Sequence, residues 1–126
     1  MNKKLLTASL IGIIVLGGII FWAFKSEKSS QSNLNIDGMV FFYSESCPHC
    51  KNVEKFLEEN KNIEEKVKFT KLEVSSNKEN QAFFVEKAKQ CKIDMNNLGV
   101  PLFWDGNGCS EGDADIIELL KEKANQ

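Results

Sequence analysis

Two cysteines separated by two residues, Cys47 and Cys50, are the part of this chain best suited to chemistry. Thiols at this spacing can close and reopen a disulfide. The apolar and aromatic run Met39–Tyr43 predicts a buried strand just upstream, and the amphipathic pattern over Pro48–Asn60 predicts a helix. The pair is therefore expected at a strand-to-helix turn.

The predicted helix gives the two sulfurs different roles. Cys47 precedes the first turn, where unpaired N–H groups and the helix dipole favour a thiolate. Pro48 suits the first helical position because it lacks an N–H group that would have no partner there. Cys50 falls one turn into the helix, on its apolar stripe. We expect Cys47 to attack a partner's sulfur and Cys50 to resolve the mixed disulfide.

His49 lies between the two cysteines and is the only histidine in the chain. It adds a hydrogen-bond donor or a positive charge near Cys47, which would stabilise the thiolate further. A cysteine pair whose reduced form is stabilised is a stronger oxidant. The Pro48-His49 dipeptide therefore favours making disulfides over breaking them.

A metal site is the alternative interpretation of the same motif, because Cys-x-x-Cys is also half of many zinc sites. Zinc usually takes four ligands, and His49 is not at a ligand spacing. The other two cysteines, Cys91 and Cys109, could complete a set of four sulfurs. We assign Cys47 and Cys50 as a redox pair with no metal, and keep metal binding as the alternative.

The remaining elements are predicted from hydrophobic periodicity and turn residues. They are an edge or bulged strand within Val67–Val74, a helix opened by a Ser76–Glu79 capping box and ending at about Cys91, a short strand from Pro101, a hairpin turn over Asp105–Gly108, a return strand from Cys109, and a last helix capped by Gly112 and Asp113. The predicted order is β-α-β-α-β-β-α, an α/β domain.

Over residues 38–126 the chain resembles the thioredoxin superfamily. The resemblance rests on the Cys47–Cys50 motif after a buried strand and on Gly99-Val100-Pro101, which opens a strand about fifty residues downstream. The element order is most similar to the glutaredoxin-like branch, in which a Gly-Gly-x-x-Asp segment falls where this chain has Glu111–Asp115. This resemblance implies a four-stranded mixed sheet flanked by three helices.

The resemblance also implies roles for particular residues. The Val100–Pro101 bond would be cis, and Pro48, Val100 and Pro101 would contact substrate. Glutaredoxins usually carry Tyr where His49 stands, and Pro-His instead resembles the periplasmic disulfide-introducing oxidases. Glu111 replaces the first glycine of the glutathione-binding pair, near where the peptide's carboxylate would lie. We therefore expect no cofactor beyond the redox-active disulfide, with glutathione disfavoured.

Cys91 and Cys109 lie, in the implied fold, at the end of the sheet remote from Cys47. A bridge between them would close a loop of about 19 residues. The sequence leaves open whether they form a second disulfide or are free buried cysteines.

Leu5–Phe24 is a run of twenty residues without charge, long enough to cross the roughly 30 Å hydrocarbon core of a bilayer. Bulky residues stand where a signal-peptide cleavage site needs small ones, which predicts an uncleaved anchor. The lysines before the run would keep residues 1–4 in the cytoplasm and export the rest. Residues 25–37 are predicted to be a polar linker and residues 38–126 the redox domain.

Charge and length exclude some classes of function. All 16 basic residues are lysines, and residues 34–126 hold 12 of them against 17 acidic residues, a net charge of −5. Binding to nucleic acid needs a basic surface and is disfavoured. A chain of 126 residues is also too short for a large multidomain enzyme.

These observations predict a single-pass membrane protein whose extracytoplasmic domain is a thiol–disulfide oxidoreductase. The Cys47–Cys50 disulfide would accept electrons from protein thiols, and a membrane or soluble partner would reoxidise it. Two alternatives remain: the same site working as a reductase fed by a transmembrane electron donor, and a membrane-tethered metal carrier that uses Cys47 and Cys50.

Overall fold

The computed structural model describes residues 33–126, and its elements follow the predicted order with one addition. They are β1 (Met39–Tyr43), α2 (Pro48–Glu59), α3 (Lys61–Lys66), β2 (Phe69–Glu73), α4 (Lys78–Gln90), β3 (Leu102–Trp104), β4 (Cys109–Glu111) and α5 (Asp113–Ala124). The addition is α3. Four helices of the described region, rather than the predicted three, therefore flank the sheet.

The four strands form one mixed sheet in the order β2-β1-β3-β4. β1 runs parallel to β2 and antiparallel to β3, and β3 is antiparallel to β4. The four-stranded mixed sheet is confirmed, and β2 lies at an edge as predicted. The central strand β1 has neighbours on both sides and its middle residues are fully buried, which explains its unbroken apolar sequence.

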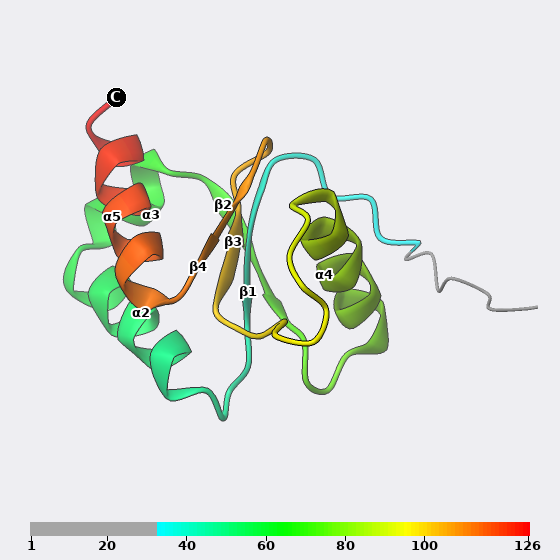
Figure 1. Ribbon diagram of the computed structural model, residues 1–126. Coiled ribbons are helices and arrows are strands. Elements are labelled where there is room, and N and C mark those ends of the chain that lie inside the picture. Colours follow the sequence, from blue (N-terminus) through cyan, green and yellow to red (C-terminus); the bar gives the residue numbers. More distant parts are fainter. Residues whose placement is uncertain (1–32) are drawn as a thin grey trace, which may run out of the picture. The chain divides into compact units, whose positions relative to one another are not determined.

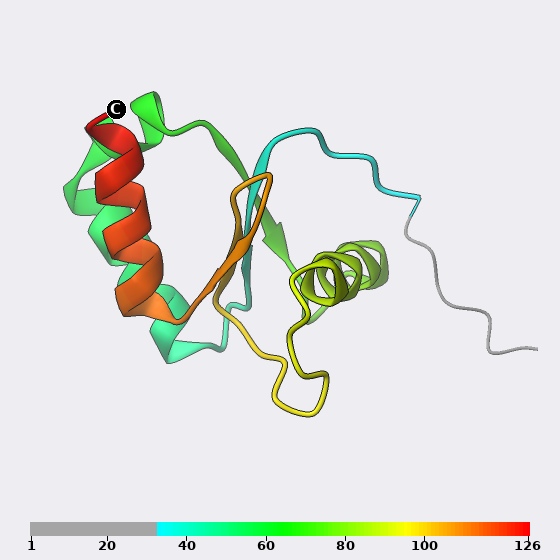
Figure 2. The same cartoon turned by 45° about the horizontal axis from the view of Figure 1, so that its top comes forward.

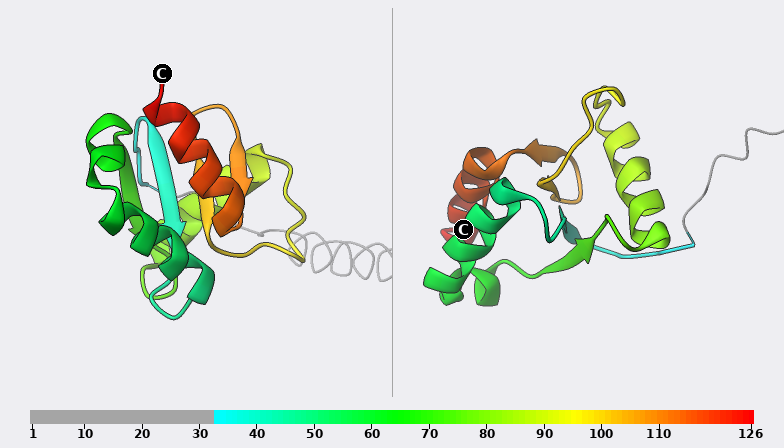
Figure 3. Two further views of the ribbon diagram at one scale, coloured as in Figure 1. Left: turned by 90° about the vertical axis from the view of Figure 1, so that its left-hand side faces the viewer. Right: turned by 90° about the horizontal axis from the view of Figure 1, so that it is seen from below.

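Helices cover both faces of this sheet. Figure 1 shows α2, α3 and α5 on one side and α4 on the other, and the turned views in Figure 2 and Figure 3 show the same layers. Alternate residues of β1 supply the two cores: Phe41 packs with α2 and α5, whereas Val40 and Phe42 pack with α4. This packing fixes α2, and the cysteine motif at its start, against the sheet.

The sequence pattern does not reveal the break between α2 and the short helix α3, which falls at Asn60. Asn60 ends α2, and its side-chain amide donates to the carbonyl of Phe56 at 2.8 Å. The six residues that follow bury only Ile63. A single apolar residue carries no period, so hydrophobic patterning has no signal for this helix.

The capping box predicted for α4 is wrong by one residue. The N-cap is Asn77, whose side-chain oxygen accepts two N–H groups of the first turn at 3.0 and 3.1 Å. Ser76 is instead bound by Glu73, which accepts the hydroxyl and N–H groups of Ser75 and Ser76. These hydrogen bonds, led by the Ser75 hydroxyl, lower the pKa of Glu73 to about 2.

Cys91 and Cys109 form a second disulfide, with Cα atoms 5.9 Å apart. Cys109 pairs with Trp104, which pairs with Val40 near the start of β1. Cys47 follows the other end of β1. The two cysteine pairs therefore lie at opposite ends of the sheet, which contradicts the alternative of one site made of four sulfurs.

Three predicted segments lie wholly or mostly outside the described residues. These are the cytoplasmic tip 1–4, the anchor 5–24 and the linker 25–37, of which the structure describes only 33–37. Within residues 33–126, no helix combines the length and the apolar character that a membrane span requires. The membrane anchor therefore stays a prediction.

The second disulfide generates a prediction about stability. Replacing both Cys91 and Cys109 by serine should lower the free energy of unfolding by about 3 kcal/mol. The reason is that the unfolded chain has more conformational entropy without the cross-link. Urea unfolding of the oxidised full-length protein measures this difference. Under strong reductant the wild-type and double variant should become nearly equal; a gap that persists there would contradict the entropic explanation.

Candidate active site

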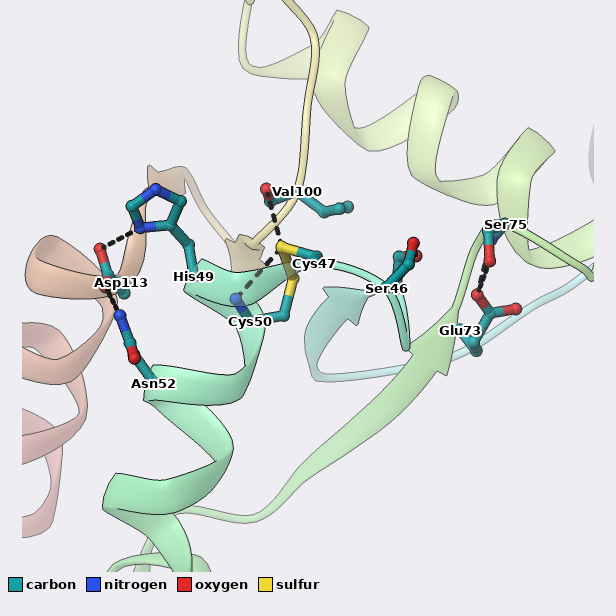
Figure 4. Close-up of a disulfide and its surroundings, with 10 residues drawn as sticks. Ser46, Cys47, His49, Cys50, Asn52, Glu73, Ser75, Val100 and Asp113 are labelled. Carbon is teal, nitrogen blue, oxygen red and sulfur yellow. Dashed lines mark hydrogen bonds and ion pairs between the residues drawn. A yellow bond between two sulfur atoms is a disulfide. The ribbon is translucent and has the colours of Figure 1, made fainter.

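The two cysteines of the predicted redox pair are joined by a disulfide, with Cα atoms 5.3 Å apart (Figure 4). Cys47 is the N-cap of α2, and Pro48 is the first helical residue, as predicted. The Cys47 sulfur accepts the N–H of Cys50 at 3.1 Å. After reduction, the same N–H group is in place to stabilise a thiolate on Cys47.

The two sulfurs differ in accessibility. Cys50 is fully buried, at 0% exposure, beside Val53 on the core side of α2. Cys47 is partly exposed. Because a partner's thiol must reach the sulfur that it attacks, we expect the mixed disulfide to form at Cys47. This matches the asymmetry expected from the helical spacing.

The segment before β3 brings Val100 beside the cysteine pair. The Val100–Pro101 peptide bond is cis, as the resemblance implies. The carbonyl oxygen of Val100 lies 3.4 Å from the Cys47 sulfur, although 53 residues separate them. Pairing of Leu102 with Phe42 produces this approach, because it places the start of β3 next to the end of β1.

The start of α5 also reaches this site. Gly112 has a φ of +83°, a conformation that glycine adopts without strain, and its N–H donates to the carbonyl of Pro101 at 3.2 Å. α5 packs along α2. Asp113, the first residue of α5, therefore lies next to the first turn of α2.

Among residues 33–126, the side chain of His49 contacts that of Asp113. The Nδ1 atom of His49 lies 3.3 Å from one Asp113 oxygen, and the Asn52 amide donates to the other. These hydrogen bonds, Asn52 first and His49 second, hold the pKa of Asp113 below its usual range. Figure 4 shows the exposed His49 ring turned towards Asp113 rather than towards the Cys47 sulfur. The influence of His49 on Cys47 thus stays a prediction.

Sequence reasoning missed Asp113 and Asn52 as members of the site. It placed Asp113 at the start of the last helix, and Asn52 lies on the polar side of the first. The missing information was the packing of α2 against α5, which the chain's local patterns do not specify. The glycine at position 112 was the available signal, because a positive φ at that point directs the incoming helix.

An open groove of about 270 Å³ lies next to the cis-proline segment. Its lining residues are His49, Gly99, Val100, Pro101, Glu111, Gly112 and Asp113. It therefore joins the expected substrate-contacting residues Val100 and Pro101 to the start of α5. Pro48 is exposed at the entrance to α2 and does not line this groove.

The described residues bring few metal-binding groups together. Within residues 33–126, no cluster of three or more His, Cys, Asp or Glu side chains could hold a metal ion. Cys47 and Cys50 are bonded to each other, and Cys91 and Cys109 are bonded at the far end of the sheet. The arrangement at Cys47 is suited to disulfide exchange.

Comparison with known proteins places the chain in a family. Residues 23–96, more than half of the chain, match the thioredoxin family model. No curated protein sequence matches the chain. Similar solved structures include Francisella tularensis glutaredoxin 1 complexed with cacodylate (16% identity, 70% of this chain and 96% of that chain, TM-score 0.48), a buckwheat glutaredoxin–glutathione complex (15%, 69% and 71%, 0.47) and oxidised Plasmodium falciparum thioredoxin (22%, 68% and 79%, 0.40). On the match of its sequence to the family model, the chain belongs to the thioredoxin family.

Proposed function

We propose that this protein is a membrane-anchored thiol–disulfide oxidoreductase that introduces disulfides into protein substrates outside the cytoplasm. The observation that carries the proposal is a partly exposed Cys47 at the start of a helix, joined by a disulfide to a fully buried Cys50. Membership of the thioredoxin family supports the same kind of activity.

The exchange needs only the groups at the site and a substrate with two thiols. A substrate thiolate attacks the Cys47 sulfur, a mixed disulfide forms, and Cys50 leaves as a thiolate that then takes up a proton. The second substrate thiolate then attacks the substrate sulfur that is bonded to Cys47, and Cys47 leaves as a thiolate. The substrate loses two electrons, and the Cys47–Cys50 pair gains them.

Oxidation of substrate is the direction that the helix terminus supports. The Cys50 N–H lies 3.1 Å from the Cys47 sulfur, so it favours the thiolate that leaves in the last step. A thiol of low pKa leaves faster, and a stabilised reduced form makes the pair more oxidising. A membrane or soluble partner would then reoxidise the pair.

The anchoring part of the proposal rests on sequence alone. Leu5–Phe24 has the length and apolar character of a membrane span, and the lysines before it favour a cytoplasmic N-terminus. The domain would then lie on the side of the membrane where disulfides persist. The Cys91–Cys109 disulfide is in keeping with such a compartment.

Replacing each redox cysteine should separate their roles. Cys47→Ser should reduce oxidation of a dithiol peptide to the uncatalysed rate, since no accessible sulfur remains. Cys50→Ser cannot form the internal disulfide. Given the same peptide in its disulfide form, the Cys47 thiolate of this variant should displace one peptide sulfur and accumulate as a mixed disulfide, visible on a non-reducing gel. The Cys91→Ser/Cys109→Ser variant is the matched control and should keep activity. Trapping through Cys50 in a Cys47→Ser variant would contradict the assigned roles.

The reduction potential of the Cys47–Cys50 couple tests the direction of electron flow. We expect a value well above the roughly −270 mV of thioredoxin. His49→Tyr should raise the pKa of the Cys47 thiol and lower the potential, by about 30 mV for each tenfold loss of thiolate stabilisation. Thiolate absorbance and equilibration with redox buffers measure both. A potential as low as thioredoxin's would favour the reductase alternative.

Deletion of residues 1–24 should release the protein from the membrane fraction of expressing cells, because the deleted segment is the only one proposed to anchor it. Full-length protein should stay in the membrane fraction after an alkaline wash. The truncated protein should keep its exchange activity. Release of the full-length protein by that wash would contradict the anchor.

A further inference from the structure

The groove beside the cysteine pair carries acidic charge. Two carboxylates line it, Glu111 and Asp113, and none of its lining residues is a lysine. Asp113 is already engaged, because one oxygen lies near His49 and the other accepts the Asn52 amide. The balance of charge that a ligand would meet therefore depends on Glu111.

Glu111 is an uncommitted carboxylate within the described part of the chain. It is the last residue of β4, and its side chain is exposed. No ion pair or hydrogen bond of its carboxylate occurs among residues 33–126. A cationic group entering the groove would therefore pair with Glu111 without displacing an existing partner.

The backbone connects this carboxylate to the reacting sulfur. Glu111 pairs with Leu102 across the β3–β4 ladder, so it lies beside the Val100–Pro101 segment. The carbonyl oxygen of Val100 lies 3.4 Å from the Cys47 sulfur. A polypeptide whose thiol reaches Cys47 along this segment would place a side chain near its cysteine within reach of Glu111.

We propose that Glu111 makes the enzyme select protein thiols flanked by lysine or arginine and disfavour acidic ones. This inference rests on the proposed function, since it assumes that Cys47 exchanges disulfides with protein thiols. The helix N-termini beside the groove carry partial positive charge, but Asp113 and Asp115 occupy the first turn of α5 and offset it. The redox domain as a whole has a net charge of −5 over residues 34–126, which acts in the same direction.

The reaction is the same disulfide exchange as in the proposed function. A substrate thiolate forms a bond to the Cys47 sulfur as the Cys47–Cys50 bond breaks, so one disulfide replaces another. Glu111 takes no part in the bond changes. It is a specificity-determining residue that raises the rate of encounter and docking for cationic segments.

Two dithiol peptides that differ only in Lys or Glu next to the first cysteine test the inference. The full-length oxidised protein should oxidise the Lys peptide faster at low salt. The neighbouring charge also changes the pKa, and so the reactivity, of the peptide's own thiol. The decisive quantity is therefore the rate for the Lys peptide divided by the rate for the Glu peptide, compared between protein variants. Glu111→Gln should reduce the ratio about threefold, the scale of a solvent-exposed ion pair.

A second variant, the salt dependence and a control variant show whether the effect comes from the charge of Glu111. Glu111→Lys should reduce the ratio further than Glu111→Gln does, and high salt should abolish the difference between wild-type and Glu111→Gln. Glu122→Gln, in the last turn of α5, is the matched control and should leave the ratio unchanged. Equal ratios in wild-type and Glu111→Gln would overturn the inference and leave the proposed function intact. Failure to oxidise either peptide would overturn both.

Discussion

The hydrogen bond from the Cys50 N–H to the Cys47 sulfur is the interaction on which the site depends. It exists because a buried strand ends just before a helix begins, so that an unpaired N–H group of the helix meets a side chain at the N-cap. The sheet and the helices of the described region hold that junction in place. The same geometry keeps one sulfur reachable and leaves the other beneath it in the core.

The sequence was informative where local chemistry and packing demand the same residue. The run Met39–Tyr43 and the stripe on α2 predicted β1 and α2 almost to the residue, since their apolar positions are the ones that become buried. It was less informative where two residues compete for the same hydrogen-bonding groups or where a helix buries a single side chain. Glu73 binds Ser76 and leaves the capping of α4 to Asn77, and α3 depends on one apolar side chain.

Contacts between elements distant in the chain were the other limit. The cysteine motif and the proline at 101 carry their own signals, because each needs a particular residue type in a particular local geometry. The approach of Asp113 and Asn52 to one another depends on how α5 lies against α2. Gly112 signals a turn before α5, but no local pattern encodes that contact. The same holds for the groove, whose lining comes from the first turn of α2, the segment before β3 and the junction of β4 with α5. The two sulfurs of the active site were therefore predictable from the sequence, whereas the contacts that α5 makes beside them were not.

The disulfide between Cys91 and Cys109 also bears on how the protein itself matures. A newly synthesised chain leaves the ribosome with all four thiols reduced, so this bond must be acquired during biogenesis. Only then does the hairpin become covalently tied to the end of α4. A protein proposed to give disulfides to others is thus first a recipient of one.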